Sequence, residues 1–382
     1  MDQISLFKVF MSEDVKDPII KTLMSGFVTQ GPRVEEFEQK LQEYFHHPYI
    51  LTLNSATAGL TLGLRVLIDK GKFDIDTDVV LSTPLTCFAT NAAIMANKAK
   101  IQWVDTDLET GNMCLEDLKN KLNEKTKVIY FVHWGGSPVN LDKLEEVKNY
   151  CFEKYGFRPY VVEDCAHAFG AEYKGKKIGT HGNIGVFSLQ AIKHLTTGDG
   201  GLIFLPNQEL YDHCKLLRWY GIDRDKRNYK RKDFRLEHDI ANYGYKFHMN
   251  DINATIGLAN LPHMDKLLIK SRENGAYYNE TLKNIKGVTL MKEYGKSAYW
   301  LYTFRIEKKM EFIQFMKEKK VMVSQVHARN DLNSCLDESR TELPKLDIIE
   351  KDLICIPVGW WVTKENREYI VKCITEFSSN FI

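Results

Sequence analysis

Apolar residues follow two different rhythms along the first part of the chain. Short, nearly continuous apolar runs predict buried strands at 49–53, 79–82, 101–104, 127–132 and 160–162. Helices are predicted between them at 34–44, 57–67 and 92–96; in the first, apolar residues recur at spacings of three and four. Strands that alternate with helices are typical of βαβ units, so the pattern predicts an α/β fold with a mostly parallel sheet.

The pattern changes near residue 255. Pro262 breaks the preceding segment, and a long helical pattern then runs from 264 to 282. Further strands are predicted at 298–304 and 353–356. These elements indicate a second, smaller unit. We therefore expect a large domain at residues 1–255 and a smaller C-terminal α/β domain at residues 256–382.

Composition narrows the class of protein. The 382 residues carry a formal net charge of +1, so no global field attracts nucleic acid or a membrane surface. We find neither a signal peptide nor an apolar run of the ~18 residues that a membrane-spanning helix needs. Eight cysteines are scattered without a CxxC pair, which favours reduced thiols in a cytoplasmic protein. His46 and His47 lack partners at metal-ligand spacing, so no metal site is expected.

Two segments carry the chemistry that the sequence indicates most strongly. Asp164 ends an apolar strand, where ligands bind in open α/β sheets. Lys193 lies further along, in a stretch bracketed by glycines that let backbone approach a ligand. A lysine amine forms a Schiff base with a cofactor aldehyde, and a carboxylate keeps the ring nitrogen protonated. The alternatives are an exposed loop lysine and a helix N-cap aspartate.

Other segments suggest where anionic groups bind. The stretch 54–59 joins a strand to a helix, so its backbone amides suit a phosphate, although plain capping by Ser55 or Asn54 is the better explanation of this stretch taken alone. Ser188 is a second candidate phosphate donor. The basic stretch 223–232, which contains Arg224, is either a diphosphate site or a solvated loop. The stretch 323–331 either lines a substrate pocket with His327 and Arg329 or is only a loop.

Several motifs follow one another in the order of a known family. They are the segments 31–38, 54–58, 84–91, 133–138, 161–170, 187–201 and 244–254. On these motifs the chain resembles the DegT/DnrJ/StrS family of nucleotide-sugar aminotransferases, which depend on pyridoxal phosphate (PLP). The resemblance implies the aspartate aminotransferase fold (PLP fold type I) and a homodimer whose active sites lie at the subunit interface.

The resemblance also implies roles around the cofactor ring. Lys193 resembles the lysine that bonds to PLP, and Asp164 resembles the partner of the ring nitrogen. His167 resembles the residue beside the phenolic oxygen of PLP. Many members place an aromatic residue over the ring where this chain has Cys87, followed by Phe88. Strand alternation would point these two side chains to opposite faces, so Cys87 is expected to pack on the ring.

The remaining roles concern the phosphate and the substrate. Phosphate ligands by resemblance are Ser55, Ala56, Thr57 and Ser188, with Lys246 reaching the phosphate from the other subunit. The expected reaction moves an amino group from L-glutamate to C4 of a nucleotide-linked 4-keto-6-deoxyhexose, with dTDP as the first choice of carrier. UDP or GDP carriers and C3 amination stay open. So do a dehydratase of the same family, whose members replace the catalytic lysine with histidine, and a PLP-binding regulator without turnover.

Overall fold

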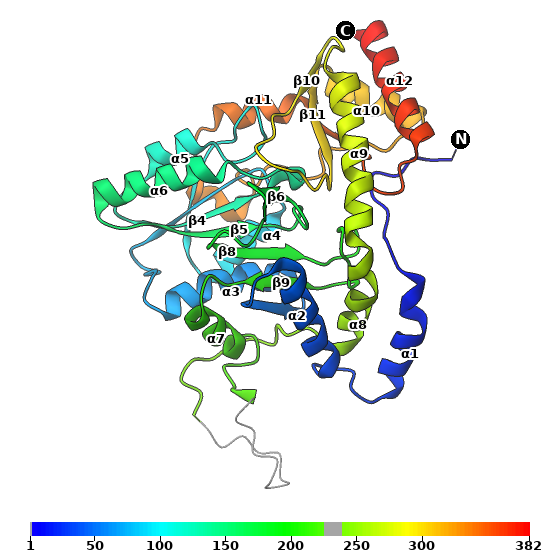
Figure 1. Cartoon of the computed structure of the whole chain (residues 1–382). Coiled ribbons are helices and arrows are strands. Elements are labelled where there is room, and N and C mark those ends of the chain that lie inside the picture. Colours follow the sequence, from blue (N-terminus) through cyan, green and yellow to red (C-terminus); the bar gives the residue numbers. More distant parts are fainter. Residues whose placement is uncertain (1, 225–238) are drawn as a thin grey trace.

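Seven strands form the central sheet of the computed structural model, which describes residues 2–224 and 239–382 (Figure 1). In spatial order they are β1 (Ile50–Leu53), β9 (Gly201–Phe204), β8 (Ile184–Ser188), β5 (Tyr160–Asp164), β4 (Thr126–Val132), β2 (Val79–Ser82) and β3 (Lys100–Trp103). β9 is antiparallel to β1 and β8, and the other pairs in this sheet are parallel. The predicted mostly parallel sheet is confirmed, with β8 and β9 as additional strands.

Helices cover both faces of this sheet (Figure 1). One face carries α2 (Pro32–Phe45), α5 (Leu115–Lys121), α6 (Leu141–Tyr155) and α8 (Asp251–Asn260). The other face carries α3 (Ala56–Asp69), α4 (Phe88–Ala96) and α7 (Gln208–Leu217). Along β5, Val161 packs in the first core and Val162 in the second, because successive strand residues point to opposite faces. The same alternation separates the side chains of Glu163 and Asp164.

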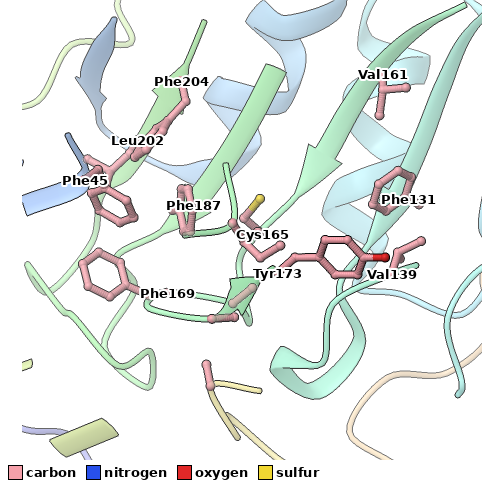
Figure 2. Packing of buried hydrophobic residues seen from close by; sticks show 14 of the residues in the cluster. Phe45, Phe131, Val139, Val161, Cys165, Phe169, Tyr173, Phe187, Leu202 and Phe204 are labelled. Atoms are coloured by element: carbon pink, nitrogen blue, oxygen red, sulfur yellow. The ribbon is translucent and has the colours of Figure 1, made fainter. Parts of the chain in front are cut away.

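Aromatic side chains fill the core around β8 and β9 (Figure 2). The ring of Phe45 packs edge-on against Phe204, with ring centroids 4.8 Å apart, and against Phe169 at 5.2 Å. Phe187 of β8 also lies 4.8 Å from Phe204. Edge-to-face pairs contribute about 0.5–1.5 kcal/mol each beyond the apolar area that they bury. This packing fixes β8, the strand from which the Lys193 segment leaves.

Two of the sequence motifs meet at the start of α2. Gly31 is the N-cap of this helix and has no side chain to bond the free amides. Asp251, the first residue of α8, instead accepts hydrogen bonds from the amides of Gly31 at 2.7 Å and of Arg33 and Val34 at 3.2 Å. A carboxylate satisfies these amides and is favoured by the positive end of the helix dipole. Asp251 therefore joins α8 to α2.

A smaller antiparallel sheet lies beyond α8, in the order β10 (Val288–Leu290), β11 (Tyr302–Ile306) and β12 (Leu353–Ile356). Its core is closed by α9 (Met264–Leu282), α10 (Lys309–Glu318) and α12 (Lys364–Phe381). The predicted strand at 298–304 is wrong in its first half: Tyr299 has a φ of 49°, which interrupts an extended chain, and β11 begins only at Tyr302. The domain boundary at residue 255 stays a prediction.

The remaining elements connect these parts. They are α1 (Lys16–Met24), the hairpin of β6 (Glu172–Tyr173) and β7 (Lys176–Lys177), and α11 (Pro344–Asp352). Pro262 lies in a short 3-10 segment, Leu261–His263, between α8 and α9, which agrees with the predicted break. Near the N-terminus, Ile4 pairs with Val321 beside the smaller sheet. Among the described residues, no helix combines the length and the apolar character needed to cross a membrane.

Candidate active site

The predicted site residues gather at the carboxyl ends of β5 and β8. Asp164 is the last residue of β5, Ser188 is the last residue of β8, and Lys193 follows in the connection to β9. The N-termini of α3 and α4 lie beside these strand ends, since α3 follows β1 and Thr90 of α4 contacts Asp164. Ligands of open α/β sheets bind at this edge. The topology therefore brings the cofactor-binding candidates together.

Asp164 is held by two donors in a buried position. The hydroxyl of Thr90 donates to Oδ2 at 2.6 Å, and the amide of Ala166 donates to Oδ1 at 3.0 Å. The hydroxyl of Thr90 is in turn 2.9 Å from that of Thr86. Burial raises the pKa of Asp164, and the hydrogen bonds and the nearby Lys193 ammonium counteract that rise. Thr90 is a functional residue that sequence reasoning missed, although it lies in the motif 84–91.

The amine of Lys193 lies close enough to Asp164 for the two charges to interact. Burial lowers the pKa of Lys193 to about 8, while Asp164 and Cys87 favour the charged form. The burial of Lys193 agrees with the sequence-based expectation of a lysine whose pKa falls toward neutrality. A lysine with this pKa is partly neutral near pH 8, as a proton-transfer group must be.

Helix α8 fixes the loop that follows Lys193. The side-chain amide of Asn253 donates to the carbonyl oxygens of Thr197, at 2.8 Å, and Asp199, at 2.6 Å. Asn260, two turns further along the same helix, donates to the carbonyl oxygen of Thr196 at 2.9 Å. Backbone carbonyls held by side-chain amides cannot shift freely, so α8 sets the position of the loop. This explains why the motif 244–254 belongs with the lysine segment.

Three aromatic rings lie almost parallel beside the lysine. His167 stacks on Trp300 with centroids 3.9 Å apart, and the ring of His327 lies 5.4 Å from that of His167. The Nε2 atoms of the two histidines are 3.4 Å apart. Burial, with the Lys193 charge, holds the pKa of His167 well below its usual range and lowers that of His327 to about 4. Both rings are therefore neutral at pH 7.

A strained turn aims His327 into the pocket. Val326 has a φ of 73°, and the amide of His327 donates to the carbonyl oxygen of Gln325 at 3.0 Å, which closes a three-residue γ-turn. A β-branched residue in the left-handed region costs about 1–3 kcal/mol and persists where the surroundings impose it. Such strain is concentrated at functional sites. The position of His327 agrees with the substrate role expected for it, which stays a prediction.

Three of the phosphate candidates, Ser55, Ala56 and Thr57, lie at the start of α3. Ser55 is the N-cap of α3, and its hydroxyl accepts from the Ala58 amide at 3.1 Å. Among the described residues, the amides of Ala56 and Thr57 have no hydrogen-bond acceptor, so they are free for an anion. Capping and phosphate binding, which the sequence left as alternatives, are thus compatible at this turn.

Gly201 explains why glycines surround the lysine segment. A Cβ atom on Gly201 would lie 2.4 Å from the backbone of Ser55 and 2.5 Å from the nitrogen of Ala56. A side chain here would displace the turn that offers the free amides. The sequence predicted that the glycines let backbone approach a ligand; at Gly201 the close approach is to the chain's own phosphate-binding turn.

Cys87 and Phe88 do not alternate as strand residues. Cys87 is the N-cap of α4 and Phe88 is its first residue, so the argument from strand alternation was wrong. Phe88 is 40% exposed, whereas Cys87 is half-buried and close enough to Lys193 to favour its charged form. The geometry agrees with Cys87 as the residue on the cofactor side. That role stays a prediction.

Lys246 and Arg224 lie at the edge of this site. The carbonyl oxygen of Lys246 accepts from the side-chain amide of Asn54 of the same chain at 3.2 Å, while its side chain is exposed. Arg224 lies over the ring of Trp219, 4.9 Å from its centroid. Lys246 therefore lies near the start of α3, whereas Arg224 also contacts the carbonyl oxygen of Gln30, at 3.4 Å, just before α2. The rest of the basic stretch, 225–232, lies outside the described residues.

Arg329 has a different setting from the one expected. Its guanidinium forms a two-pronged ion pair with Asp331, at 2.9 and 2.7 Å, and also contacts Asp347. These carboxylates occupy the donors that a substrate phosphate would need. Substrate binding by Arg329 stays a prediction, and its contacts argue for a structural role.

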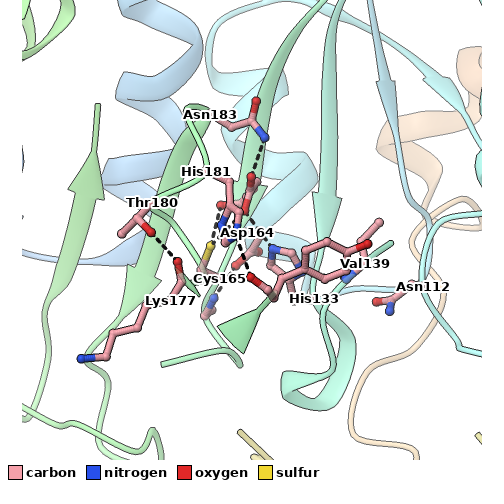
Figure 3. Close-up of polar contacts among 12 residues, drawn as sticks. Asn112, His133, Val139, Asp164, Cys165, Lys177, Thr180, His181 and Asn183 are labelled. Carbon is pink, nitrogen blue, oxygen red and sulfur yellow. Dashed lines mark hydrogen bonds and ion pairs between the residues drawn. The ribbon is translucent and has the colours of Figure 1, made fainter. Parts of the chain in front are cut away.

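A buried polar network lies behind Asp164, on the other face of β5 (Figure 3). The amide of Val139 donates to Nδ1 of His133 at 3.0 Å, so His133 carries its proton on Nε2 and donates it to Glu163 at 3.0 Å. Asn183 also donates to Glu163, at 2.6 Å. Although burial raises the pKa of Glu163, these bonds hold it below its usual value.

This network also bears on metal binding. His133, Glu163 and Cys165 offer ligand atoms within 4.8 Å of one another, the arrangement that a metal ion requires. Both ring nitrogens of His133 are already bonded, and the thiol of Cys165 is directed at Glu163. The three residues therefore form a hydrogen-bonded support for β5.

The donor set matches the chemical groups of PLP. The free amides at the start of α3 and the hydroxyl of Ser188 suit a phosphate, and the buried Asp164 suits a protonated ring nitrogen. Nδ1 of His167 is buried without a partner among the described residues and is available to an oxygen on the ring. Lys193 supplies the amine for an aldehyde.

Comparison with known proteins agrees with this geometry. The model of the DegT/DnrJ/EryC1/StrS aminotransferase family matches residues 10–375. The crystal structure of AtS13 from Actinomadura melliaura is 42% identical, covers 98% of this chain and 99% of that chain, and has a TM-score of 0.93. GDP-perosamine synthase of Escherichia coli O157:H7 is 28% identical over 100% of both chains. UDP-4-amino-4,6-dideoxy-N-acetyl-beta-L-altrosamine transaminase of Campylobacter jejuni is 34% identical over 75% of this chain and 72% of that protein.

These findings settle the class of the protein. The family match spans nearly the whole chain, and solved relatives share its layered α/β architecture, that of PLP fold type I. The family uses PLP, and the residues that line the site fit that cofactor. The chain belongs to the DegT/DnrJ/EryC1/StrS aminotransferase family and is a PLP-dependent sugar aminotransferase.

Proposed function

We propose that this enzyme transfers the amino group of L-glutamate to C4 of a nucleotide-linked 4-keto-6-deoxyhexose. The observation that carries the proposal is the pairing of Lys193, just after β8, with the buried Asp164 at the end of β5, whose charges interact. PLP supplies an electron sink when it is bound at this site. With PLP bound, the Lys193 amine would move a proton between the α-carbon of the amino donor and the cofactor, and would reverse that transfer for the sugar.

The other residues orient the cofactor and the substrate and balance their charges. Asp164 stays ionised through Thr90 and the Ala166 amide and holds the ring nitrogen protonated. The neutral rings of His167 and His327 donate or accept hydrogen bonds without adding a charge next to the Lys193 amine. The proposed role of Arg224 is to attract the diphosphate of a nucleotide sugar, and that of Lys246 is to reach the cofactor phosphate of the other subunit.

The name of one relative supports amination at C4, because it is a transaminase named for a UDP-linked 4-amino-4,6-dideoxy sugar. A second relative is named GDP-perosamine synthase, so the sugars in these two names are linked to UDP and GDP. Our first choice of dTDP rests on resemblance. An aminotransferase is favoured over a dehydratase because Lys193 stands at the position where the dehydratases of this family carry histidine. The neighbouring His194 is bonded instead to the carbonyl oxygen of Ala298 at 2.9 Å.

We also propose that the enzyme is a homodimer. Apolar side chains are exposed along and after α1: Ile20, Leu23, Met24, Phe27 and Val28, with Met24 82% exposed. Contiguous apolar surface of this kind usually marks a protein contact. A second copy of the chain would cover this surface. The proposed location is the cytoplasm, where the free cysteines stay reduced. Light scattering should give about twice the 44.3 kDa of one chain; a monomer would contradict the dimer.

A substrate screen tests the reaction. The purified enzyme, loaded with PLP, is mixed with L-glutamate and 4-keto-6-deoxyhexoses on dTDP, UDP or GDP, and products are identified by mass spectrometry and NMR. We expect 2-oxoglutarate and a 4-amino sugar in equal amounts, with one carrier preferred. A 3-amino product would overturn the position of transfer, and release of the sugar hydroxyl without amination would support the dehydratase.

A further inference from the structure

Trp300 contacts the Lys193 segment in two ways. The amine nitrogen of Lys193 lies 3.5 Å from the centroid of the Trp300 ring. The indole Nε1–H of the same side chain donates to the carbonyl oxygen of Ile192, the residue before Lys193, at 2.9 Å. Trp300 is only 4% exposed, so both contacts lie away from water. One side chain thus touches the reactive group and the backbone that carries it.

The indole ring is itself fixed from distant parts of the chain. His167, after β5, stacks on it with centroids 3.9 Å apart and an interplanar angle of 20°. Phe7, near the N-terminus, stacks at 5.0 Å and 27°. Trp300 precedes β11 of the smaller sheet. The ring therefore presents one defined face to Lys193.

We propose that Trp300 is a positioning residue for Lys193. Its ring face holds the free ammonium group whenever the amine is not bonded to the cofactor, and its indole N–H fixes the backbone before the lysine. The proposal rests on the proposed function, because it matters only if Lys193 alternates between a bonded and a free state. It extends that function by assigning the support of the free state to a residue beside the smaller sheet.

The Trp300 ring acts on only one protonation state of the Lys193 amine. The negative face of an indole attracts an ammonium ion and has little attraction for a neutral amine. Asp164 and Cys87 also favour the ammonium ion, whereas burial opposes it. Three imidazoles face the same amine, those of His167, His194 and His327, and each has a lowered pKa. Trp300 differs from all of these residues because its ring attracts the ammonium ion and has no group that titrates itself.

Fluorinated tryptophan at position 300 isolates this attraction. Fluorine withdraws electron density from the ring face, while the shape of the ring and its N–H donor are nearly unchanged. The cofactor-free protein is prepared with tryptophan or its mono-, di- or trifluoro form at this position. The rate at which an amine-directed reagent modifies Lys193 is then measured against pH by peptide mass spectrometry, and the midpoint gives the pKa of the amine.

We expect the midpoint, near 8 in the unsubstituted protein, to fall stepwise with each fluorine. The whole series should lower it by about one unit, a tenfold change in the protonation equilibrium. The matched control is Trp361, whose indole donates instead to the carbonyl oxygen of Ser5 at 2.8 Å. Fluorination there should leave the midpoint unchanged. A midpoint at Lys193 that ignores fluorine at position 300, or responds equally at 361, overturns the proposal.

Loading the same proteins with PLP separates the two levels of the argument. A visible absorption band that depends on Lys193 supports the proposed function in every member of the series. If the unsubstituted protein shows no such band, the proposed function fails. If the band forms throughout and the midpoint stays flat, only the role of Trp300 fails.

Discussion

Replacing Thr90 by valine removes the strongest support of Asp164 with little change of shape. The hydroxyl of Thr90 donates to the buried carboxylate at 2.6 Å, and only the Ala166 amide, at 3.0 Å, remains afterwards. A hydrogen bond to a charged, buried group is worth about 1.5–3 kcal/mol. The loss should therefore destabilise the Asp164 carboxylate by about that much and raise its pKa further.

The consequence is a weaker hold on the protonated cofactor nitrogen, because the carboxylate is less stable as an anion. We expect the first half-reaction to slow by about 10- to 100-fold, in line with that loss of stabilisation. The assay is stopped-flow measurement of the visible cofactor band after addition of the amino donor. Thr90→Ser keeps the hydroxyl and should retain most of the rate. A Thr90→Val enzyme as fast as the unchanged one would refute this reasoning about Asp164.

Three further predictions concern stability and the substrate contacts. Burial lowers the pKa of His194 and His327 from about 6.5 to about 4, so below pH 6.5 the unfolded chain binds protons that the folded protein does not. The free energy of unfolding should therefore fall below pH 6.5 by up to about 1.4 kcal/mol per pH unit for each ring. Urea unfolding at pH 7 and 5.5 measures this, and a free energy that does not change with pH would speak against neutral rings. Glu163→Ala leaves the donors of His133 and Asn183 unpaired and should lower the free energy of unfolding by about 3–5 kcal/mol, whereas a loss below 1 kcal/mol would show that the network is not a support. Arg329→Gln should reduce stability and leave the KM for the nucleotide sugar unchanged; a raised KM with unchanged stability would restore its expected substrate role.

Local patterns predicted several elements with the correct bounds. The strands at 79–82 and 353–356 and the helix at 264–282 have the same bounds in the structure as in the sequence pattern. β8 and β9 escaped because their apolar runs lie among the glycines and hydroxyl residues of the lysine segment. The reversed direction of β9 is a property of strand pairing, which no local pattern records.

The site residues show the same difference between local patterns and contacts that are distant in the sequence. Lys193 and Asp164 were identifiable because a lysine and a strand-end carboxylate are rare together in this setting. Thr90 and Trp300 were not, because their importance lies in contacts across 74 and 108 positions of the chain, from Thr90 to Asp164 and from Trp300 to Ile192. Arg329 shows a different limit: the sequence offers it as an isolated cation in a polar loop, and only the structure shows its ion pairs with Asp331 and Asp347. Its substrate role stays a prediction.

The central claim is that Lys193 carries the cofactor. Borohydride reduction of the PLP-loaded enzyme fixes the cofactor on whichever lysine bears it, and mass spectrometry of the digested protein locates the added mass. The account predicts a phosphopyridoxyl group on the peptide that contains Lys193 and on no other peptide. The same modification on a different lysine, in a protein that shows the visible cofactor band, would contradict it.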